Sequence, residues 1–368
     1  MWQFTENKQW EYLKQTFDWV HDMHGVPQDP IFHAEGDVAT HTQMVLNSLL
    51  ELREYQQLDP QQQEILWTAA LMHDIEKRTT TIIEADGRIT SAGHAKKGEK
   101  TVRELLYCNY PTPFEIREQI AKLVRYHGLP LWIFEKENPE QTLIKASLEV
   151  NMQMLTMLAR ADVLGRQCKD KQELLYKIDL FEAFCQELTC WEHPKLFASN
   201  FCRFSYFQQS DYYTDTLLFD DTQTTVILMA GIAGAGKDTF IQKYYPNMNV
   251  ISLDAIRTEL QISPTDKKGN GQVVQYAKKL AKELLHKKIP FIWNATNITQ
   301  SMRMQLIQLF STYKASIKIV YLEVPYRSLL QQNKNRQAVV PTDVIHRMIS
   351  KLEIPSQWEA HEVEYHVV

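Results

Sequence analysis

Cysteine is scarce in this 368-residue chain and follows no ligand or redox pattern. The five cysteines include no Cys-x-x-Cys pair, which is the spacing that zinc sites and redox motifs use. Their odd number and irregular spacing exclude a disulfide framework and favour reduced thiols. We therefore expect a cytoplasmic protein.

Long apolar runs are absent as well. No stretch approaches the ~20 apolar residues of a membrane-spanning helix, so we expect no membrane partner. The opening residues, MWQFTENKQWEYLK, lack the apolar core of a secretory signal, and we expect none. The net charge of −5 is not that of a polycation, so any contact with nucleic acid must come from local basic patches.

Length and pattern along the chain predict two domains. Helical spacing of apolar residues dominates up to about residue 195, as at Val38, Val45 and Leu49, with Asp37 as an N-cap. One hairpin is predicted in TTTIIEADGRITSAG, with its turn at Asp86-Gly87.

The composition changes after residue 195. The segment 196–221 is rich in aromatic residues and lacks a clean period, so we interpret it as a connector. From residue 222 to 368, strands alternate with helices and the chain ends in helices, which predicts an α/β domain on a parallel sheet. The first domain, 1–195, is predicted to be all-α.

The stretch VILMAGIAGAGKDTF, residues 226–240, has the form of a strand, a glycine-rich turn and a helix start. A GxxxxGK pattern in that context indicates a phosphate loop. Backbone N–H groups would surround the phosphates of ATP or another NTP, and the lysine would reach the β and γ phosphates. The predicted nucleotide-binding residues are Gly231, Gly234, Ala235, Gly236, Lys237, Asp238 and Thr239.

Asp238 stands where most phosphate loops have serine or threonine. A carboxylate beside phosphates is repulsive unless a cation lies between them. We therefore expect Asp238 near Mg²⁺, with Thr239 supplying the hydroxyl contact. The alternative is that Asp238 caps the helix and points away from the nucleotide.

Polar residues follow the next predicted strands. Asp254 lies at the carboxyl edge of the sheet, where its carboxylate is suited to orient and deprotonate an attacking hydroxyl. Arg257 is suited to hold an acceptor phosphate. Thr296 and Asn297 suit acceptor contact or a simple turn, and Arg336 is either a lid residue that neutralises the transferred phosphoryl group or a solvated arginine.

The helical half carries a series of histidines and aspartates with metal-ligand chemistry. They fall on apolar helix faces or at helix ends, so they can point to one place. Imidazole with carboxylate suits Mn, Fe, Co, Ni or Zn, and two metals ~3.5–4 Å apart clamp a phosphate and generate hydroxide. The predicted ligands are His41, His73, Asp74 and Asp162, with His94 and His127 completing a second site.

Two cations lie within about one turn of these residues. Lys77 follows in HDIEK, and Arg166 is four residues after Asp162 on the same helix face, where it is suited to hold a phosphate. The alternative for both is a solvated surface cation. For His33, in HAEGDVATHT, substrate contact and helix capping both remain open.

The helical half resembles the HD superfamily of metal-dependent phosphohydrolases, and HAEGDVATHT is similar to the entry segment of HD domains joined to tRNA nucleotidyltransferases. The resemblance implies that Lys77 contacts phosphate. Residues 225–365 resemble 5′-hydroxyl polynucleotide kinases through GxxGxGK, LDxxR, TN and R…VP…V. That resemblance implies Asp254 as the general base, Arg257 on the adjacent phosphate and Arg336 on ATP.

Over its whole length the chain resembles the bacterial HD-Pnk family, in which an HD phosphoesterase precedes a polynucleotide kinase. This implies hydrolysis of 2′,3′-cyclic, 2′- or 3′-phosphate ends, phosphorylation of 5′-OH ends of RNA or DNA, and a nucleic-acid ligase as partner. The residues alone also allow a nucleoside or metabolite kinase fused to a nucleotide phosphohydrolase, or an ATP-gated regulatory module.

Two features are candidates for nucleic-acid contact. The lysines at 267, 268, 278, 279, 282, 287 and 288 are suited to follow backbone phosphates, or they form a solvated face. The aromatic residues from Phe201 to Tyr213 are suited to stack on bases, or they pack between domains.

Overall fold

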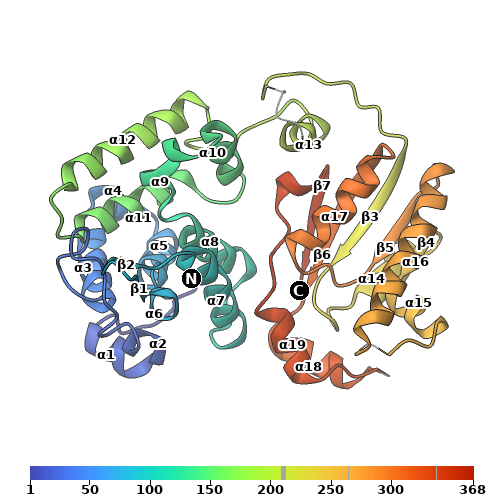
Figure 1. Ribbon diagram of the computed structural model, residues 1–368, viewed down its shortest axis with the longest axis horizontal. Coiled ribbons are helices and arrows are strands. Elements are labelled where there is room, and N and C mark those ends of the chain that lie inside the picture. The colour runs from blue at the N-terminus through green and yellow to red at the C-terminus, as the bar shows by residue number, and fades with distance from the viewer. Residues whose placement is uncertain (209–212, 264, 337) are drawn as a thin grey trace. The chain divides into compact units, whose positions relative to one another are not determined.

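The chain divides into two units, Met1–Leu196 and Phe197–Val368. The computed structural model describes residues 1–208, 213–263, 265–336 and 338–368, and the side chain at 267 is also outside the described set. The first unit is helical and the second is built on a parallel sheet, which confirms the predicted fold class (Figure 1). Within these described residues, no helix combines the length and the apolar character needed to span a bilayer.

The first unit folds around a large apolar core. Its helices are α1 (Trp10–Thr16), α2 (Asp18–His21), α3 (Val38–Glu51), α4 (Arg53–Gln56), α5 (Pro60–Met72), α6 (Lys77–Thr80), α7 (His94–Cys108), α8 (Phe114–Tyr126), α9 (Leu129–Trp132), α10 (Pro139–Ser147), α11 (Met152–Leu164) and α12 (Lys171–Glu187), with a 3₁₀ turn η1 (Ile133–Glu135). Residues of α9, α11 and α12 also form a smaller apolar cluster.

Helix α5 occupies the centre of this core. Asp59 caps it and Pro60 stands in its first turn, both favourable at a helix start. Every residue from Glu64 to Met72 is buried, so α5 is enclosed on all sides rather than amphipathic. Helices α3, α8 and α11 pack against it. Helix α5 therefore ends inside the unit, and His73 and Asp74 follow directly at this buried C-terminal end.

Local signals in the first unit are confirmed. Asp37 caps α3, because its carboxylate accepts a hydrogen bond from the Thr40 N–H at 2.8 Å. The predicted hairpin forms from β1 (Ile82–Ile83) and β2 (Ile89–Thr90), which pair antiparallel. Gly87 in the turn has a φ of 86°, a conformation that glycine adopts without strain.

The second unit contains a five-stranded sheet in the order β4-β5-β3-β6-β7, with all neighbours parallel. Its elements are α13 (Asn200–Gln208), β3 (Thr224–Ala230), α14 (Lys237–Tyr244), β4 (Asn249–Ser252), α15 (Leu253–Glu259), α16 (Lys267–His286), β5 (Phe291–Asn294), α17 (Gln300–Ser311), β6 (Ala315–Glu323), α18 (Tyr326–Lys334), α19 (Thr342–Ile349), the 3₁₀ turn η2 (Gln357–Glu359) and β7 (Glu362–Val367).

The central strand β3 carries the phosphate loop. It lies between β5 and β6, and its run Val226–Ala230 is buried throughout, as expected for a strand covered on both faces. The loops after β3, β4 and β5 leave from the same edge, because the strands are parallel. This edge gathers the predicted kinase residues.

The end of the chain differs from the prediction. Helices α18 and α19 form as expected, but the chain then closes with strand β7, paired in parallel with β6. The strand alternates buried and exposed residues only weakly and follows a proline-containing loop, so the pattern alone gave no strong strand signal.

The aromatic segment taken as a connector contains helix α13, which belongs to the second unit. Phe204 stacks on His361 with ring centroids 4.0 Å apart, and Arg203 donates to the carbonyls of Gln357 and His361. Tyr213 is exposed, whereas residues 209–212 of the predicted stacking segment lie outside the described residues. Part of this segment is thus a packing element of the α/β unit.

Close contact between α3 and α11 generates a stability prediction. A Cβ on Gly165 would come within 2.8 Å of both the backbone nitrogen and Cγ2 of Val45. We expect Gly165→Ala to destabilise the first unit by about 1–3 kcal/mol, because overpacking forces these helices apart. The control is Gly128→Ala, whose Cβ would meet Trp132 at an ordinary 3.8 Å. Denaturant unfolding measures both, and equal stability of the two variants would contradict the prediction.

Candidate metal centre and nucleotide site

The predicted metal ligands of the helical unit lie together, although they come from five helices or helix ends. They form two groups, and within each group the ligand atoms all lie within 4.8 Å of one another. One group is His41, His73 and Asp162, and the other is Asp74, His94 and His127. All are buried except His94, whose side chain is 24% exposed. The centre is therefore enclosed, and His94 is the one predicted ligand among the described residues with a partly exposed side chain.

Asp74 joins the two groups. Its Oδ2 lies 3.2 Å from His73 Nε2 and 3.8 Å from His41 Nε2, whereas its Oδ1 lies 3.3 Å from His94 Nε2. His127 Nε2 is 3.8 Å from the same Oδ1. Each carboxylate oxygen thus faces a different set of imidazoles. Asp74 would therefore be placed to contribute one oxygen to each set of imidazoles when metal is bound.

Backbone carbonyls orient three of the histidines. His73, His94 and His127 direct Nδ1 at carbonyl oxygens three residues earlier in the chain, at 2.7–2.8 Å. A carbonyl can only accept, so Nδ1 carries the proton and Nε2 keeps its lone pair. All three Nε2 atoms consequently face the centre in the form that binds a metal.

Unpartnered buried atoms show that the residues fit a cation. His41 Nε2, His73 Nε2 and Asp74 Oδ1 are shielded from solvent and make no directed hydrogen bond. Such atoms are costly unless something binds them. A set of imidazole nitrogens and carboxylate oxygens suits a divalent transition metal and leaves its identity open.

Lys77 and Arg166 bind the two carboxylates directly. Lys77 Nζ lies 2.8 Å from Asp74 Oδ2 and also donates to Gln28, and Arg166 holds both oxygens of Asp162 at 2.6 and 3.1 Å. Both side chains are largely buried, so neither is a solvated surface cation.

These cations also set the charge state of the aspartates. Burial by itself would raise the pKa of Asp74, but the Lys77 ammonium holds it well below its usual range. Burial likewise opposes ionisation of Asp162, and the Arg166 guanidinium lowers its pKa well below the usual range. Both carboxylates are therefore ionised and ready to bind a metal at neutral pH.

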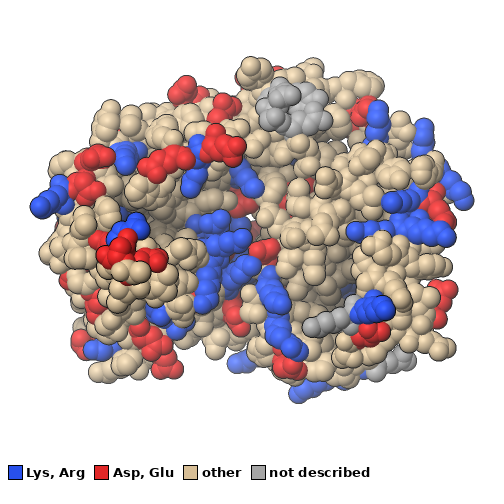
Figure 2. All heavy atoms as spheres, viewed as in Figure 1, with Lys and Arg blue, Asp and Glu red and all other residues tan. Residues whose placement is uncertain are grey.

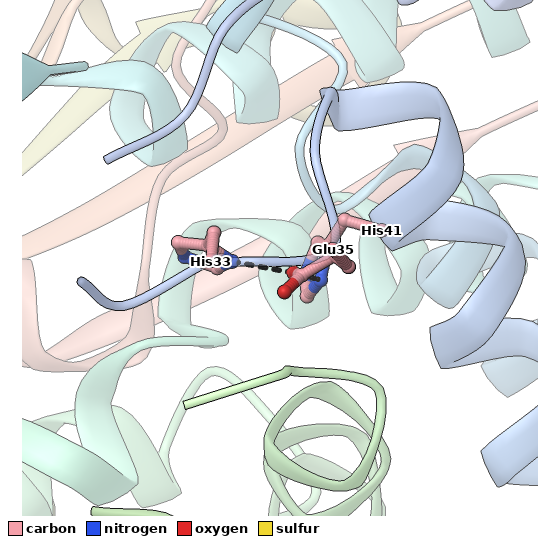
Figure 3. A group of neighbouring side chains, drawn as sticks. All are labelled: His33, Glu35 and His41. Carbon is pink, nitrogen blue, oxygen red and sulfur yellow. Dashed lines mark hydrogen bonds and ion pairs between the residues drawn. The ribbon is translucent and has the colours of Figure 1, made fainter. Parts of the chain in front are cut away.

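Glu35 is a site residue that sequence reasoning missed. Its Oε1 lies 2.8 Å from Nδ1 of both His33 and His41, and its side chain is shielded from solvent (Figure 3). The available signal was weak: a glutamate two residues after His33 in a segment without helical period. His33 is the single one of these three residues with an exposed edge, at 11%.

In the second unit the phosphate loop has the expected shape. Gly231 has a φ of 139°, and a Cβ there would come within 2.4 Å of the Leu322 carbonyl oxygen. Gly234 and Gly236 also have positive φ, and Gly236 precedes α14. Ala235 is buried beneath the loop and Thr239 is exposed at the helix start. The loop therefore presents the helix N-terminus in the form that binds phosphate.

Lys237 lies against the loop itself. Its Nζ donates to the carbonyls of Gly231 and Ile232 at 2.9 and 3.0 Å. Burial lowers the pKa of Lys237 to about 8, against the opposing effect of Asp238. Arg336 lowers that pKa further and Asp254 raises it, which places both charged groups within electrostatic range of the lysine.

Asp238 does not act as a helix cap. Gly236 holds the N-cap position without a side-chain bond, and Asp238 Oδ1 instead accepts a hydrogen bond from Asn294 Nδ2 at 2.6 Å. Asn294 ends β5, is buried and was not predicted as a site residue. The side chain of Asp238 is thus directed at the carboxyl edge of the sheet.

The acceptor-side residues differ in their environment. Asp254 in the first turn of α15 pairs with Arg257, and its side chain is 77% exposed. Arg257 also donates to Asn270 at 2.9 Å. Arg336 follows α18, in a segment that Asn333 closes by binding both backbone groups of Val340. Asp254 is therefore open to solvent, whereas its partner Arg257 is largely covered.

Thr296 and Asn297 shape the loop after β5. The Thr296 carbonyl accepts from the Gly231 N–H at 2.9 Å, so this loop supports the phosphate loop. Asn297 is buried with a φ of 43°, and its side-chain amide donates to the Met229 carbonyl at 2.7 Å. Its contacts are with the backbone of the unit, and an acceptor contact by either residue stays a prediction.

Each of the two units contains a segment that matches a known protein family. Residues 38–160 match the HD domain family and residues 226–355 match the AAA domain family. The L-seryl-tRNA(Sec) kinase of Methanococcus maripaludis is 27% identical over 135 residues, which cover 35% of this chain and 53% of that protein. The multifunctional CCA protein of Methylococcus capsulatus is 33% identical over 118 residues, covering 32% and 25%.

The chain thus spans about half and a quarter of the length of these two curated relatives. Among solved structures, a candidate kinase from Chloroflexus aurantiacus matches with a TM-score of 0.34 and 15% identity, over 40% of this chain and 86% of its own. The N-terminal part of the chain thus matches an HD domain, and the C-terminal part, with its phosphate loop, matches a P-loop kinase-like domain. The first implies a divalent metal and the second implies ATP and Mg²⁺.

The bridging position of Asp74 predicts the metal stoichiometry. We expect wild-type protein to bind two Mn²⁺ ions in the helical unit, His94→Ala to bind one, and Asp74→Ala to lose both, because the two oxygens of Asp74 lie near histidines of both groups. Equilibrium dialysis with metal analysis measures the count. Retention of two ions by Asp74→Ala would contradict the bridge, and Lys237→Ala in the other unit serves as the control.

The environment of Lys237 predicts a pH dependence of ATP binding. Phosphates favour the ammonium form, so ATP raises a pKa that is about 8 in the free protein. Affinity is therefore full below pH ~8 and falls as the pH rises above it, by up to ~10-fold per unit. Calorimetric titration of ATP across this range measures the effect. Lys237→Arg stays charged and should show a flat profile; equal slopes in both proteins would contradict the assignment.

Proposed function

We propose that this chain is a nucleic-acid end-healing enzyme. The helical unit hydrolyses 2′,3′-cyclic, 2′- or 3′-phosphate ends, and the α/β unit transfers the γ-phosphate of ATP to a 5′-OH end of RNA or DNA. The observation that carries the proposal is the exposure of Asp254, whose side chain is 77% exposed, at the edge that holds the phosphate loop. An open acceptor edge admits the end of a polymer, whereas a nucleoside kinase encloses its small substrate.

In the helical unit the chain's own residues bind and orient the phosphate. Lys77 and Arg166 are each bonded to one carboxylate and retain further N–H donors for phosphate oxygens. The bound metals supply Lewis acidity and an activated water. His33, with its exposed edge and the charges of Lys77 and Arg166 nearby, lies on the substrate side of the centre.

In the α/β unit the transfer is an in-line displacement at the γ-phosphorus. The 5′-hydroxyl oxygen forms the new P–O bond, its proton passes to the Asp254 carboxylate, and the bond to the β–γ bridging oxygen breaks to release ADP. Arg257 orients Asp254 and is suited to hold the adjacent backbone phosphate. Lys237 and Arg336 stabilise the negative charge on the transferred group, and Asp238 with Thr239 is suited to the Mg²⁺ side of the nucleotide.

Positive charge on α16 supports a polymeric substrate. Six lysines lie on this helix or directly after it, at 268, 278, 279, 282, 287 and 288. Among the described residues, none of these six forms an ion pair; the side chain at 267 is outside this set. A hollow of about 430 Å³ is lined by Lys278, Lys279 and Lys282 together with Gln275 and Leu309. Figure 2 shows Lys and Arg side chains on this side of the unit. Uncompensated lysines favour contact with backbone phosphates.

The relatives and the chemistry agree with such a substrate. One relative's name specifies a kinase that acts on an RNA-linked group, L-seryl-tRNA. The two proposed reactions leave 3′-OH and 5′-phosphate ends, which are the ends that a nucleic-acid ligase joins. The five free cysteines are consistent with action in the cytoplasm.

An oligonucleotide with two reactive ends tests the proposal. It carries a 5′-OH at one end and a 2′,3′-cyclic phosphate at the other. We incubate it with ATP and Mg²⁺ or Mn²⁺ and resolve the products by electrophoresis. We expect wild type to change both ends, Lys237→Ala to lose at least ~100-fold at the 5′ end only, and Asp74→Ala to lose the 3′ event only. A parallel reaction contains nucleosides and mononucleotides. Reaction of these small molecules with no change at either oligonucleotide end would overturn the proposal.

A further inference from the structure

One histidine of the metal centre is oriented differently from the others. His73, His94 and His127 use carbonyls of their own chain three residues earlier, so each ring is fixed by the element that carries it. His41 lies mid-way through the first half of α3, where the carbonyls of the helix are engaged in helical bonds. Its Nδ1 therefore needs an acceptor from outside its helix.

The side chain that faces this nitrogen is Glu35. Its Oε1 lies 2.8 Å from His41 Nδ1, although the N–H is not aimed directly at the oxygen. On the opposite side of the ring, His41 Nε2 lies 3.0 Å from Asp162 and faces the metal ligands. A proton held on Nδ1 by the carboxylate leaves Nε2 with the lone pair that a metal requires.

Glu35 is itself held in place from two sides. Its Oε2 accepts the backbone N–H of Gln167 at 2.8 Å, and the neighbouring Ala34 N–H donates to the Gln167 carbonyl at 2.9 Å. His33 Nδ1 contacts the same Oε1 as His41, as Figure 3 shows. The segment before α3 is thus tied to the loop that follows α11, next to Asp162 and Arg166.

We propose that Glu35 is a positioning residue that fixes the ring of His41 as a metal ligand and, through the same oxygen, the ring of His33 on the substrate side. The inference rests on the proposed metal-dependent activity of the helical unit. It links the orientation of one ligand to that of one substrate-facing histidine, so loss of Glu35 disturbs metal binding and substrate turnover together.

A direct metal contact by Glu35 is the competing interpretation, because His33, Glu35 and His41 also form a group that could hold a cation. That would require His41 to bind metals through both ring nitrogens and so to lose both protons. It would also place a metal beside the Glu35 carboxylate, whose Oε2 already accepts the Gln167 backbone N–H. The geometry favours Glu35 as an acceptor of N–H bonds.

The test compares Glu35→Ala, Glu35→Gln and Asp37→Ala in the full chain. Asp37 caps the same helix but belongs to none of the candidate metal-binding groups, so its variant reports on a purely structural weakening of α3. Mn²⁺ affinity and count are measured by calorimetry and metal analysis, thermal unfolding is measured without metal, and turnover uses bis-p-nitrophenyl phosphate.

We expect Glu35→Ala to weaken binding of one of two Mn²⁺ ions by ~10–100-fold, and Glu35→Gln to recover most of that loss because its amide oxygen still accepts an N–H. Asp37→Ala should lower the unfolding temperature with unchanged Mn²⁺ affinity. Unchanged affinity in Glu35→Ala, equal losses in the Ala variants of Glu35 and Asp37, or a wild-type count of three ions that falls to two, would each overturn the inference.

The metal titration needs no nucleic acid, so its outcome is separate from that of the proposed function. If the wild type binds two ions and Glu35→Ala weakens one, while no oligonucleotide end reacts, the positioning role stands and the end-healing proposal fails. If both ends react and Mn²⁺ binding is indifferent to Glu35, the end-healing proposal stands and the positioning role fails.

Discussion

Two buried carboxylates organise the helical unit. Asp74 and Asp162 lie in an interior where an isolated charge would cost several kcal/mol, and each is bonded to a cation and surrounded by imidazoles. Moving either aspartate would leave its buried partner, Lys77 or Arg166, without a counter-charge at a similar energetic cost. The five helices that carry the aspartates and histidines of the centre must therefore keep their register. The close approach of Gly165 to Val45 is part of that constraint, because it brings α11 against α3.

The α/β unit has a comparable buried pair below its site. Arg303 is fully buried and holds both oxygens of Glu359 at 2.7 and 2.8 Å, and it donates to the carbonyls of Asn297 and Glu353. Asn297 has a left-handed backbone conformation in the loop whose Thr296 carbonyl supports the phosphate loop. The ion pair therefore connects η2 near the chain's end with the edge where phosphate is expected to bind.

The sequence revealed those parts of the sites that follow a local rule. The phosphate loop has fixed spacing, His41 and Asp162 fall on helical faces, and the Asp86-Gly87 turn predicts its own hairpin. The sequence did not reveal Glu35 and Asn294, because their partners are distant in sequence or lie across a strand boundary, and a single carboxylate or amide carries no periodic signal. It did not reveal strand β7 either, because the pairing of β7 with β6 is set by tertiary contact and not by the weak alternation of the strand itself.

The cations of the two sites are held in different ways. In the helical unit, the buried carboxylates of Asp74 and Asp162 hold Lys77 and Arg166 in place. In the α/β unit, burial lowers the pKa of Lys237 to about 8 and its nitrogen rests on loop carbonyls, while Asp254 is exposed to solvent.

A nucleotide bound at that loop would replace the carbonyls as partner of Lys237 and stabilise its charge. Under the proposed function, the centre of the helical unit is preorganised by folding, whereas the site of the α/β unit reaches its working electrostatics only when a nucleotide binds. This difference follows from where the carboxylates lie: inside a helical core in one unit, and at the open edge of a sheet in the other.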